Sequence, residues 1–281
     1  MTANRKWKRK VRAHAARTGQ SYTAALRFLR STEEAHMRSY TTTTAGLTDI
    51  GTVRTSNEDH LLSDGDLFVV ADGMGGTGRG ELASRLAAET VRAEFGHNRT
   101  ADALVNAVRT ANRAVRDLGA GPDGSMGSDR PFGTTIAAVA MVSERDREEV
   151  VSVNVGDSRV YLRRDGRLQL LSRDHSVVGD LVRAGSIEEA DAVDHPERHI
   201  LTQAIGTAEA VTPHVEVVRP ASGDRLLLCS DGLFNDLPVA EINRLLDIGD
   251  PDEAAGGLIS AAVAAGGRDN ITALVVDIRA I

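Results

Sequence analysis

The sequence predicts a layered α+β domain in which antiparallel sheets are covered by helices. Short apolar runs bounded by Gly, Asp and Ser recur along the chain, and such runs are typical of strands. Two pairs of longer segments with apolar residues at helical spacing interrupt them. Runs of strands interleaved with paired helices favour helix layers packed on sheets.

The chain begins with a basic helical segment. Residues 5–18 are predicted to form a helix that ends at Gly19. Ser21 follows at a position suited to cap a second short helix over residues 22–30. We interpret residues 1–44 as a basic extension with a polar linker, Thr41 to Thr44, at its end.

Helices and strands of the main domain, residues 45–281, follow from the apolar spacing. Helices are expected at 81–95, 101–118, 176–184, 239–246 and 252–265. Strands are expected at 61–62, 67–71, 134–142, 150–155, 159–164, 168–171, 215–218, 225–230 and 272–278. Asp165-Gly166 is typical of a hairpin turn, and the Gly, Pro, Asp and Ser of residues 119–131 indicate a loop.

Composition limits the class of protein. The 281 residues are 41% apolar, which is enough for a core, but only 3% aromatic. The single cysteine, Cys229, excludes an intramolecular disulfide and a thiolate zinc site, and it fits the cytoplasm. Neither a run of 18 apolar residues nor a secretory signal pattern is found, so we expect no membrane span and a cytoplasmic location.

Charge is divided unevenly along the chain. Residues 1–40 hold ten Lys/Arg and two Asp/Glu, a charge of +8, whereas the other 241 residues hold 23 and 38, a charge of −15. The extension is either a solvated basic tail or a small helical module that docks on an acidic partner, nucleic acid or a membrane surface. Nucleic acid is an unfavourable partner for the main domain, because its net charge repels phosphates.

Acidic residues that follow apolar runs carry the chemistry. Asp72, Asp157 and Asp231 each follow an apolar run that is predicted to be a strand, and Asp269 stands beside Asn270. One such Asp is usually a turn residue or a helix cap. Several carboxylates at one sheet edge repel each other, and a divalent metal is the usual remedy. Oxygen ligands favour Mg²⁺ or Mn²⁺, so we interpret the chain as a metal enzyme.

Other chemistries fit less well. Residues 73–78 match the dinucleotide pattern G-x-G-x-x-G, but a second helix follows where a strand with an acidic residue is needed. Cys229 lies in an apolar strand that raises a thiol pKa, and no phosphate-binding Arg follows it. His175 and His195 have no histidine partner four residues away, so a helical zinc site is unfavourable.

Taken in order, these motifs resemble those of the metal-dependent PPM-type (type 2C) serine/threonine protein phosphatases in their bacterial form. The resemblance runs from Thr48 to Asp277. It rests on Arg54-x-x-Asn57-Glu58-Asp59, Asp72-Gly73-Met74-Gly75-Gly76, Phe132-Gly133-Thr134-Thr135, Gly156-Asp157-Ser158-Arg159, Asp174-His175-Ser176, Ser230-Asp231-Gly232-Leu233 and Asp269-Asn270-Ile271-Thr272. Each motif is weak alone, but their order is specific.

The resemblance implies a four-layer α-β-β-α sandwich, two antiparallel sheets flanked by helix pairs, with metals at one end of the sheets. Two core ions, Mn²⁺ or Mg²⁺, are implied. Asp72 would bridge them, the Gly73 carbonyl would complete one site, and Asp231 and Asp269 would complete the other. Asp157 would help to hold a third, weaker metal.

The resemblance also implies the reaction. A metal-bridging hydroxide would hydrolyse phosphoserine or phosphothreonine in proteins by direct attack. Arg54 would hold the phosphate, while Glu58 and Asp59 would act near the metals, partly through water. The alternative of the same fold is a catalytically weak phosphoprotein-binding regulator. Expected partners are phosphoproteins, including a serine/threonine kinase or its substrates.

Three positions depart from the family pattern. Thr77 stands where many bacterial relatives have His, and Met74 where some others have His. The general acid is therefore unassigned. His199 replaces an Asn common in the family's flap segment, which bears on substrate choice rather than on the metals.

Overall fold

The computed structural model describes residues 3–27, 29, 39–75, 79–96, 99–119, 132–144, 147–192 and 194–281. The chain forms two compact units, residues 1–41 with Ile281 and residues 42–280. Most of the predicted loop at 119–131, and the position of Thr77, lie outside the described residues. Within those residues, no helix has both the length and the apolar character needed to cross a bilayer.

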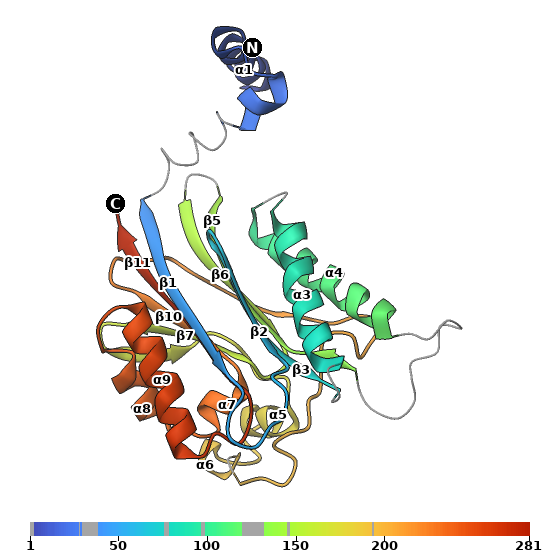
Figure 1. The fold of residues 1–281 in the computed structure, drawn as a ribbon, viewed down its shortest axis with the longest axis vertical. Coiled ribbons are helices and arrows are strands. Elements are labelled where there is room, and N and C mark those ends of the chain that lie inside the picture. The colour runs from blue at the N-terminus through green and yellow to red at the C-terminus, as the bar shows by residue number, and fades with distance from the viewer. Residues whose placement is uncertain are drawn as a thin grey trace. The chain divides into compact units, whose positions relative to one another are not determined.

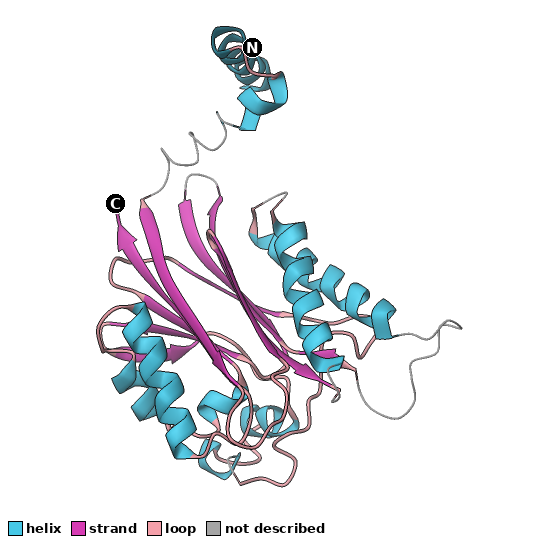
Figure 2. Cartoon of the chain, in the orientation of Figure 1, coloured by secondary structure: helices cyan, strands magenta, loops and turns pink. Residues whose placement is uncertain are grey.

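Two sheets form the centre of the larger unit (Figure 2). The strand order of the first sheet is β1 (Tyr40–Asp49), β11 (Ile271–Ala280), β10 (Arg225–Cys229), β7 (Arg159–Arg164) and β8 (Arg167–Leu170). The order of the second is β2 (Asp59–Asp64), β3 (Leu67–Met74), β5 (Ile136–Glu144), β6 (Arg147–Val155) and β9 (His214–Val218), and the short β4 (Gly133–Thr134) pairs with the end of β3.

Helices cover the outer faces of both sheets (Figure 1). The second sheet is covered by α3 (Arg79–Phe95) and α4 (Ala101–Gly119), and the first by α8 (Val239–Leu245) and α9 (Pro251–Ala265). Shorter helices are α5 (Val177–Arg183), α6 (Glu189–Ala192) and α7 (Asp231–Phe234). The predicted four-layer α-β-β-α sandwich is confirmed.

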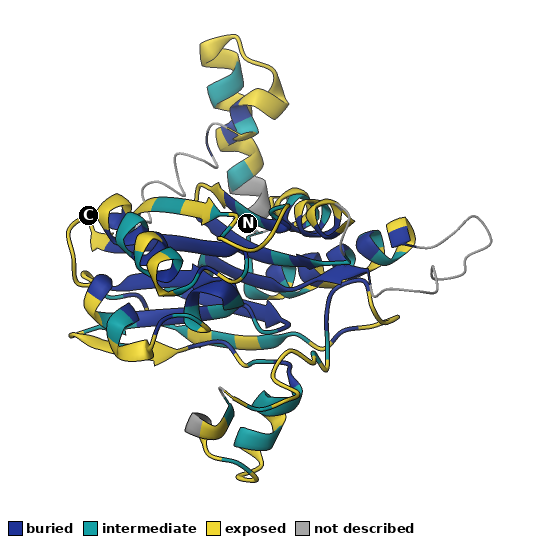
Figure 3. Ribbon diagram, turned by 60° about the horizontal axis from the view of Figure 1, so that its bottom comes forward, coloured by how far each residue is buried: buried dark blue, intermediate teal, exposed yellow. Residues whose placement is uncertain are grey.

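One buried cluster lies between each sheet and its helix pair, and the strands are the most deeply buried elements (Figure 3). Val69, Val91 and Val153 are fully buried on the α3–α4 side. Leu258 and Val275 are fully buried on the α8–α9 side. Burying one such side chain stabilises the fold by about 1.5–3 kcal/mol. Aliphatic side chains thus make the core that the low aromatic content required.

Strand β1 corrects one expectation. Thr41 to Thr44 were predicted as a polar linker, but they belong to a ten-residue strand. The Thr44 hydroxyl donates to the Val275 carbonyl at 2.9 Å, which ties the strand to β11. Threonine is β-branched and suits a partly exposed edge strand, so a polar run was not a sign of a linker here.

Strand register places the acidic motifs at one end of the sandwich. In the first sheet, Cys229 lies opposite both Arg159 and Ala273, so the segments that bear Asp157, α7 and Asp269 all emerge beside the end of β10. In the second sheet, Asp72 lies opposite Asp59. Residues far apart in sequence are thereby brought to one sheet end.

Candidate active site

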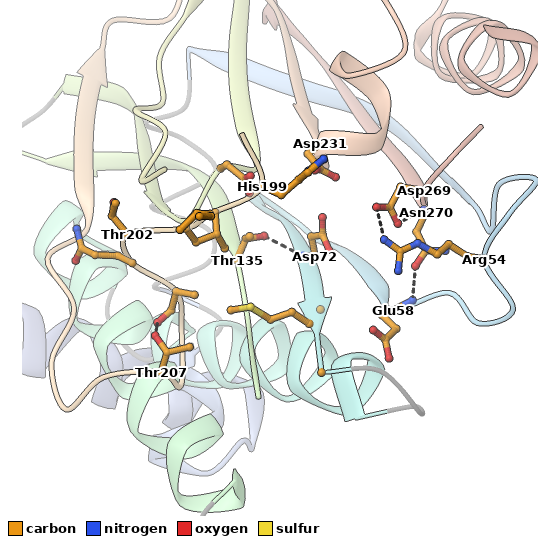
Figure 4. A pocket seen from close by; sticks show the side chains of 18 residues that line it. Arg54, Glu58, Asp72, Thr135, His199, Thr202, Thr207, Asp231, Asp269 and Asn270 are labelled. Carbon is orange, nitrogen blue, oxygen red and sulfur yellow. Dashed lines mark hydrogen bonds and ion pairs between the residues drawn. The ribbon is translucent and has the colours of Figure 1, made fainter. Parts of the chain in front are cut away.

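A cleft of about 740 Å³ opens at this end of the sheets (Figure 4). The predicted site residues that line it are Arg54, Glu58, Asp72, Gly73, Asp157, Asp231 and Asp269. They come from β3, from α7 and from loops between elements. Thr135, His199 and Asn270 complete much of the wall. Asp59 does not line the cleft but lies buried beneath it.

Asp72 is fixed at the end of β3 by Thr135. The Asp72 backbone N–H donates to Thr135 Oγ1 at 2.9 Å, and the Thr135 N–H donates to the Asp72 carbonyl at 2.8 Å. These bonds fix the backbone and leave the carboxylate oxygens for other partners. Burial raises the pKa of Asp72 well above its usual range, and the negative charges of Asp59 and Asp231 raise it further.

Asp157 and Asp231 show the same electrostatic character. Burial raises the pKa of Asp157, and the charge of Asp231 adds to this effect. Burial also raises the pKa of Asp231, followed by the charge of Asp269, although Asn235 donates to Asp231 Oδ2 at 3.0 Å. Buried carboxyls that raise each other's pKa favour a bound cation, because a cation relieves both burial and repulsion.

Glu58 and Gly73 approach each other closely. A Cβ added to Gly73 would lie 2.1 Å from the Gly80 carbonyl oxygen and 2.6 Å from that of Glu58, so only glycine fits. The Gly73 N–H donates to the Glu58 carbonyl at 3.1 Å. Glu58 Oε1 is buried without a hydrogen-bond partner. An orphaned carboxylate oxygen beside the cleft is costly unless a cation or water satisfies it.

Asp59 is held below the cleft by two hydroxyl groups. Ser230 Oγ and Thr272 Oγ1 each donate to Asp59 Oδ2 at 2.7 Å, whereas Oδ1 has no partner. Burial raises the pKa of Asp59 to about 7, and the charges of Asp231 and Asp269 contribute. Asp59 therefore supports the cluster from behind rather than facing the cleft.

Arg54 forms an ion pair with Asp269, with 2.6 Å between Nη2 and Oδ2. Both side chains are partly exposed, 54% and 35%. Asn270 organises the backbone next to them, because its Oδ1 accepts the Glu58 N–H at 2.8 Å and its Nδ2 donates to the carbonyls of Ile50 and Ser56. The predicted phosphate-binding residue thus lies against a predicted metal ligand.

The groups that line the cleft suit a hard divalent cation, because they offer carboxylate oxygens together with the closely packed backbone of Gly73. In the part of the chain that the structure describes, no group of three or more His, Cys, Asp or Glu side chains is gathered tightly enough to hold a metal by itself. Arg54 engages Asp269, and the negative charge of Asp231 contributes to the raised pKa of Asp72. Mg²⁺-type sites need few protein carboxylates, because water fills the remaining positions.

Sequence reasoning missed the supporting residues. Thr135 and Asn270 stood inside quoted motifs without an assigned role, and so did Arg159 and Asp174. The Arg159 guanidinium contacts both Asp174 oxygens, its Nη2 lying 2.7 Å from Oδ2, and it stacks on Phe234 at 3.8 Å. It lies in a second cavity of about 460 Å³ that shares Asp157 and Asp231 with the cleft.

The structure also argues against a cysteine nucleophile and against a dinucleotide-binding site. Cys229 is fully buried in β10, and burial raises the pKa of its thiol to about 12, so it is no thiolate nucleophile. After α3 the chain continues into α4 rather than into a strand, so the βαβ unit of a dinucleotide site is not formed there.

Comparisons with known proteins agree with this geometry. The family model for protein phosphatase 2C matches residues 52–252. The chain belongs to the protein phosphatase 2C family. It is 35% identical over 243 residues to the serine/threonine phosphatase stp of Listeria innocua, with 82% of this chain and 93% of the relative covered. The predicted family and enzyme class are confirmed.

Solved structures give the same result. The PPM Ser-Thr phosphatase MsPP of Mycobacterium smegmatis, in complex with cacodylate, is 41% identical with a TM-score of 0.76, covering 84% of this chain and 97% of that one. The catalytic domain of PstP in complex with 2 manganese ions is 32% identical with a TM-score of 0.75, covering 85% and 99%. The chain spans 44% of full-length PstP of Mycobacterium tuberculosis, to which it is 35% identical.

Proposed function

We propose that this serine/threonine phosphatase removes phosphate from phosphoserine and phosphothreonine in proteins at the cleft described above, with two Mn²⁺ or Mg²⁺ ions as cofactors. The observation that carries the assignment is the convergence of Asp72, Asp231 and Asp269, from three distant segments, on one cleft. The manganese complex of PstP supports the choice of ion.

Asp72, Asp231, Asp269 and the Gly73 carbonyl are the groups that would hold the core ions, and Asp157 would contribute to a third, weaker site. When bound, such ions would supply a water of lowered pKa and would withdraw charge from the phosphoryl oxygens. Glu58 lies close enough to this wall of the cleft to orient water with its unpartnered Oε1. Asp59 holds the sheet ends together through Ser230 and Thr272.

Arg54 is the group that we assign to the substrate phosphate. Its guanidinium is planar and offers paired donors that match two phosphoryl oxygens. The side chain is 54% exposed at the mouth of the cleft, so it can leave Asp269 and turn toward a phosphate without repacking the core. The Asp269 hydrogen bond raises the pKa of Arg54, so its charge is permanent.

The test is hydrolysis of p-nitrophenyl phosphate and of a phosphothreonine peptide by the full chain in Mn²⁺, with and without EDTA. We expect turnover in Mn²⁺, loss of turnover in EDTA, and loss in Asp231→Asn. The control Asp117→Asn changes an exposed carboxyl on α4 and should keep the rate. Turnover in EDTA, or a wild-type rate for Asp231→Asn, would overturn the assignment.

Binding without turnover would instead support the regulator of the same fold. Measuring phosphopeptide affinity in the same buffers separates the two outcomes. We further propose that the partners of the enzyme are a serine/threonine kinase or its substrates. We place the protein in the cytoplasm, where the buried free thiol of Cys229 needs no disulfide partner.

A further inference from the structure

The N-terminal unit has a small core of its own. Helix α1 (Ala3–Thr18) ends at Gly19, whose φ of +69° is left-handed. Helical residues 22–27 follow, with the Ser21 hydroxyl accepting the Ala24 N–H at 3.2 Å. Val11 of α1 is fully buried against Ala25 and Leu29, and Trp7, Ala15 and Leu26 pack around them. The unit is a helical hairpin whose apolar face is already covered.

The surface of this hairpin is strongly basic. Residues 3–27 contain eight Lys/Arg and no Asp or Glu. Exposed members whose side chains the structure describes are Lys8, Arg9, Lys10, Arg12, Arg17 and Arg27. Within α1, Trp7, Val11 and Ala15 recur every four positions and take one side, so the exposed cations lie on the rest of the circumference.

The positive charge near the N-terminus of α1 does not stabilise the helix. The first turn of α1 has no acidic residue. Anions are favoured at that end of a helix, and cations are disfavoured, by about 0.3–1 kcal/mol each. The sequence therefore carries positive charge where it weakens the helix, and binding of an external polyanion would offset that loss.

The covered apolar stripe of α1 disfavours a membrane surface as the polyanion. A helix that lies in a membrane surface must present its apolar face to lipid, but the stripe of Trp7, Val11 and Ala15 is packed on the second helix. The outer face instead carries exposed Ala13 and Ala16 between the cations, so this face can approach a partner closely.

We propose that the N-terminal hairpin binds duplex DNA through its phosphates, with α1 along the major groove. Duplex DNA carries one negative charge per ~1.7 Å of axis, and α1 is about 24 Å long at 1.5 Å per residue. The B-form major groove admits a helix, whereas that of duplex RNA is too deep and narrow.

The test is fluorescence anisotropy of a labelled DNA duplex of about 20 base pairs with the full chain in EDTA, across a salt series. We expect binding that weakens about 10²- to 10³-fold between ~50 and ~200 mM salt, as four to six phosphate contacts would give. The double variant Lys8→Gln, Arg12→Gln should weaken binding at least about tenfold and lower the salt slope by about 2.

The matched control is Arg109→Gln, Arg113→Gln, an exposed pair with the same helical spacing on α4. It should leave DNA affinity within about twofold. Far-ultraviolet circular dichroism, unchanged in both double variants, shows that the helices of the hairpin are folded. Hydrolysis of p-nitrophenyl phosphate in Mn²⁺, also unchanged, shows that the phosphatase domain is folded. This readout also separates the DNA proposal from the proposed function, since neither pair touches the cleft.

Four outcomes would overturn the proposal. The first is the absence of DNA binding at low salt, and the second is an equal loss in the control variant. Tighter binding to phosphatidylglycerol vesicles would identify a membrane partner instead. Equal binding to polyglutamate or to duplex RNA would show that the hairpin does not select duplex DNA.

Discussion

Arg54 and Asp269 form an ion pair, with Nη2 of the arginine 2.6 Å from Oδ2 of the aspartate. The sequence assigned these residues to different ligands, phosphate and metal. Because of this contact, the carboxylate of Asp269 would be shared between the guanidinium of Arg54 and a bound metal ion. Substitution of Arg54 should therefore affect the two ligands in different ways.

Arg54→Ala should raise KM for a phosphopeptide by about tenfold or more, because a charge-assisted paired contact to phosphate is lost. Affinity for Mn²⁺, measured by calorimetry without substrate, should not weaken, since Asp269 loses a competitor. Arg268→Ala, a neighbouring exposed arginine paired with Asp236, is the control. A collapse of Mn²⁺ affinity in Arg54→Ala would show that Arg54 supports the metal site.

A substitution at Gly80 tests the close packing of Glu58 against Gly73, one of the proposed metal ligands. A Cβ at this position would lie 2.5 Å from Glu58 Oε2 and 2.8 Å from the Gly73 carbonyl carbon. Gly80→Ala should therefore shift the Glu58–Gly73 contact and lower kcat by about tenfold or more. Gly256→Ala, on α9, meets its nearest atom only at 4.0 Å and should stabilise the protein by about 0.5–1 kcal/mol. Mn²⁺-dependent kinetics and thermal unfolding, measured for both variants, check the expected loss of kcat and the expected gain in stability.

A rise in pH should lower the stability of the metal-free protein and increase the stabilisation that Mn²⁺ gives. The pKa of Asp59 is raised to about 7, and those of Asp72, Asp157 and Asp231 are also raised. Unfolded Asp has a pKa of about 3.9. The folded protein in EDTA therefore binds more protons than the unfolded chain between these values, and its stability falls as pH rises through about 7.

Thermal unfolding in EDTA should show a higher Tm near pH 6 than near pH 8. The stabilisation by added Mn²⁺ should grow over the same range, because carboxylates bind metal only when deprotonated. Asp231→Asn should flatten both trends. A Tm in EDTA that rises from pH 6 to pH 8 would contradict the buried, mutually repelling cluster.

Arg159 should act as a positioning residue for Asp174 and for α7, which carries Phe234. Arg159→Lys keeps the charge but loses the paired contacts to Asp174 and the stacking on Phe234. We expect the Mn²⁺ concentration for half-maximal rate to rise about threefold or more, since Asp157 and Asp231 line the same cavity. Arg163→Lys is the control, because Arg163 also lies on β7 and pairs with Asp247. A loss of Tm alone, equal in both variants, would indicate a merely structural role.

Most of the fold could be predicted because the elements rest on local patterns. The apolar spacing of α3 and α4 and the hairpin of β2 and β3 follow from residues close in sequence. β1 could not be recognised, since its residues are mostly polar and its strand state depends on pairing with β11, more than 200 residues away. The acidic positions stood out because a charge after an apolar run is costly.

The contacts that organise the site could not be predicted. Whether Arg54 meets Asp269, and whether Thr135 holds Asp72, depends on which strand ends lie side by side. Glu58 and Asp59 are adjacent in sequence, but only Glu58, which precedes β2, lines the cleft. Asp59 begins β2 and is buried against the hydroxyls of Ser230 and Thr272. Side-chain direction at a strand end is set by register, which the sequence does not display.

The corrected position of β1 leads to the last prediction. Deleting residues 1–38 should leave hydrolysis of a small phosphate ester within about threefold of the full chain, because every proposed ligand lies beyond residue 53. Deleting residues 1–44 removes the first half of β1 and exposes part of β11, so it should lower the Tm by several degrees, at a cost of about 2–3 kcal/mol. Calorimetry and ester hydrolysis of the two truncations check the boundary. Equal Tm values would restore residues 41–44 as a linker, and loss of turnover in the shorter deletion would make the hairpin part of the catalytic unit.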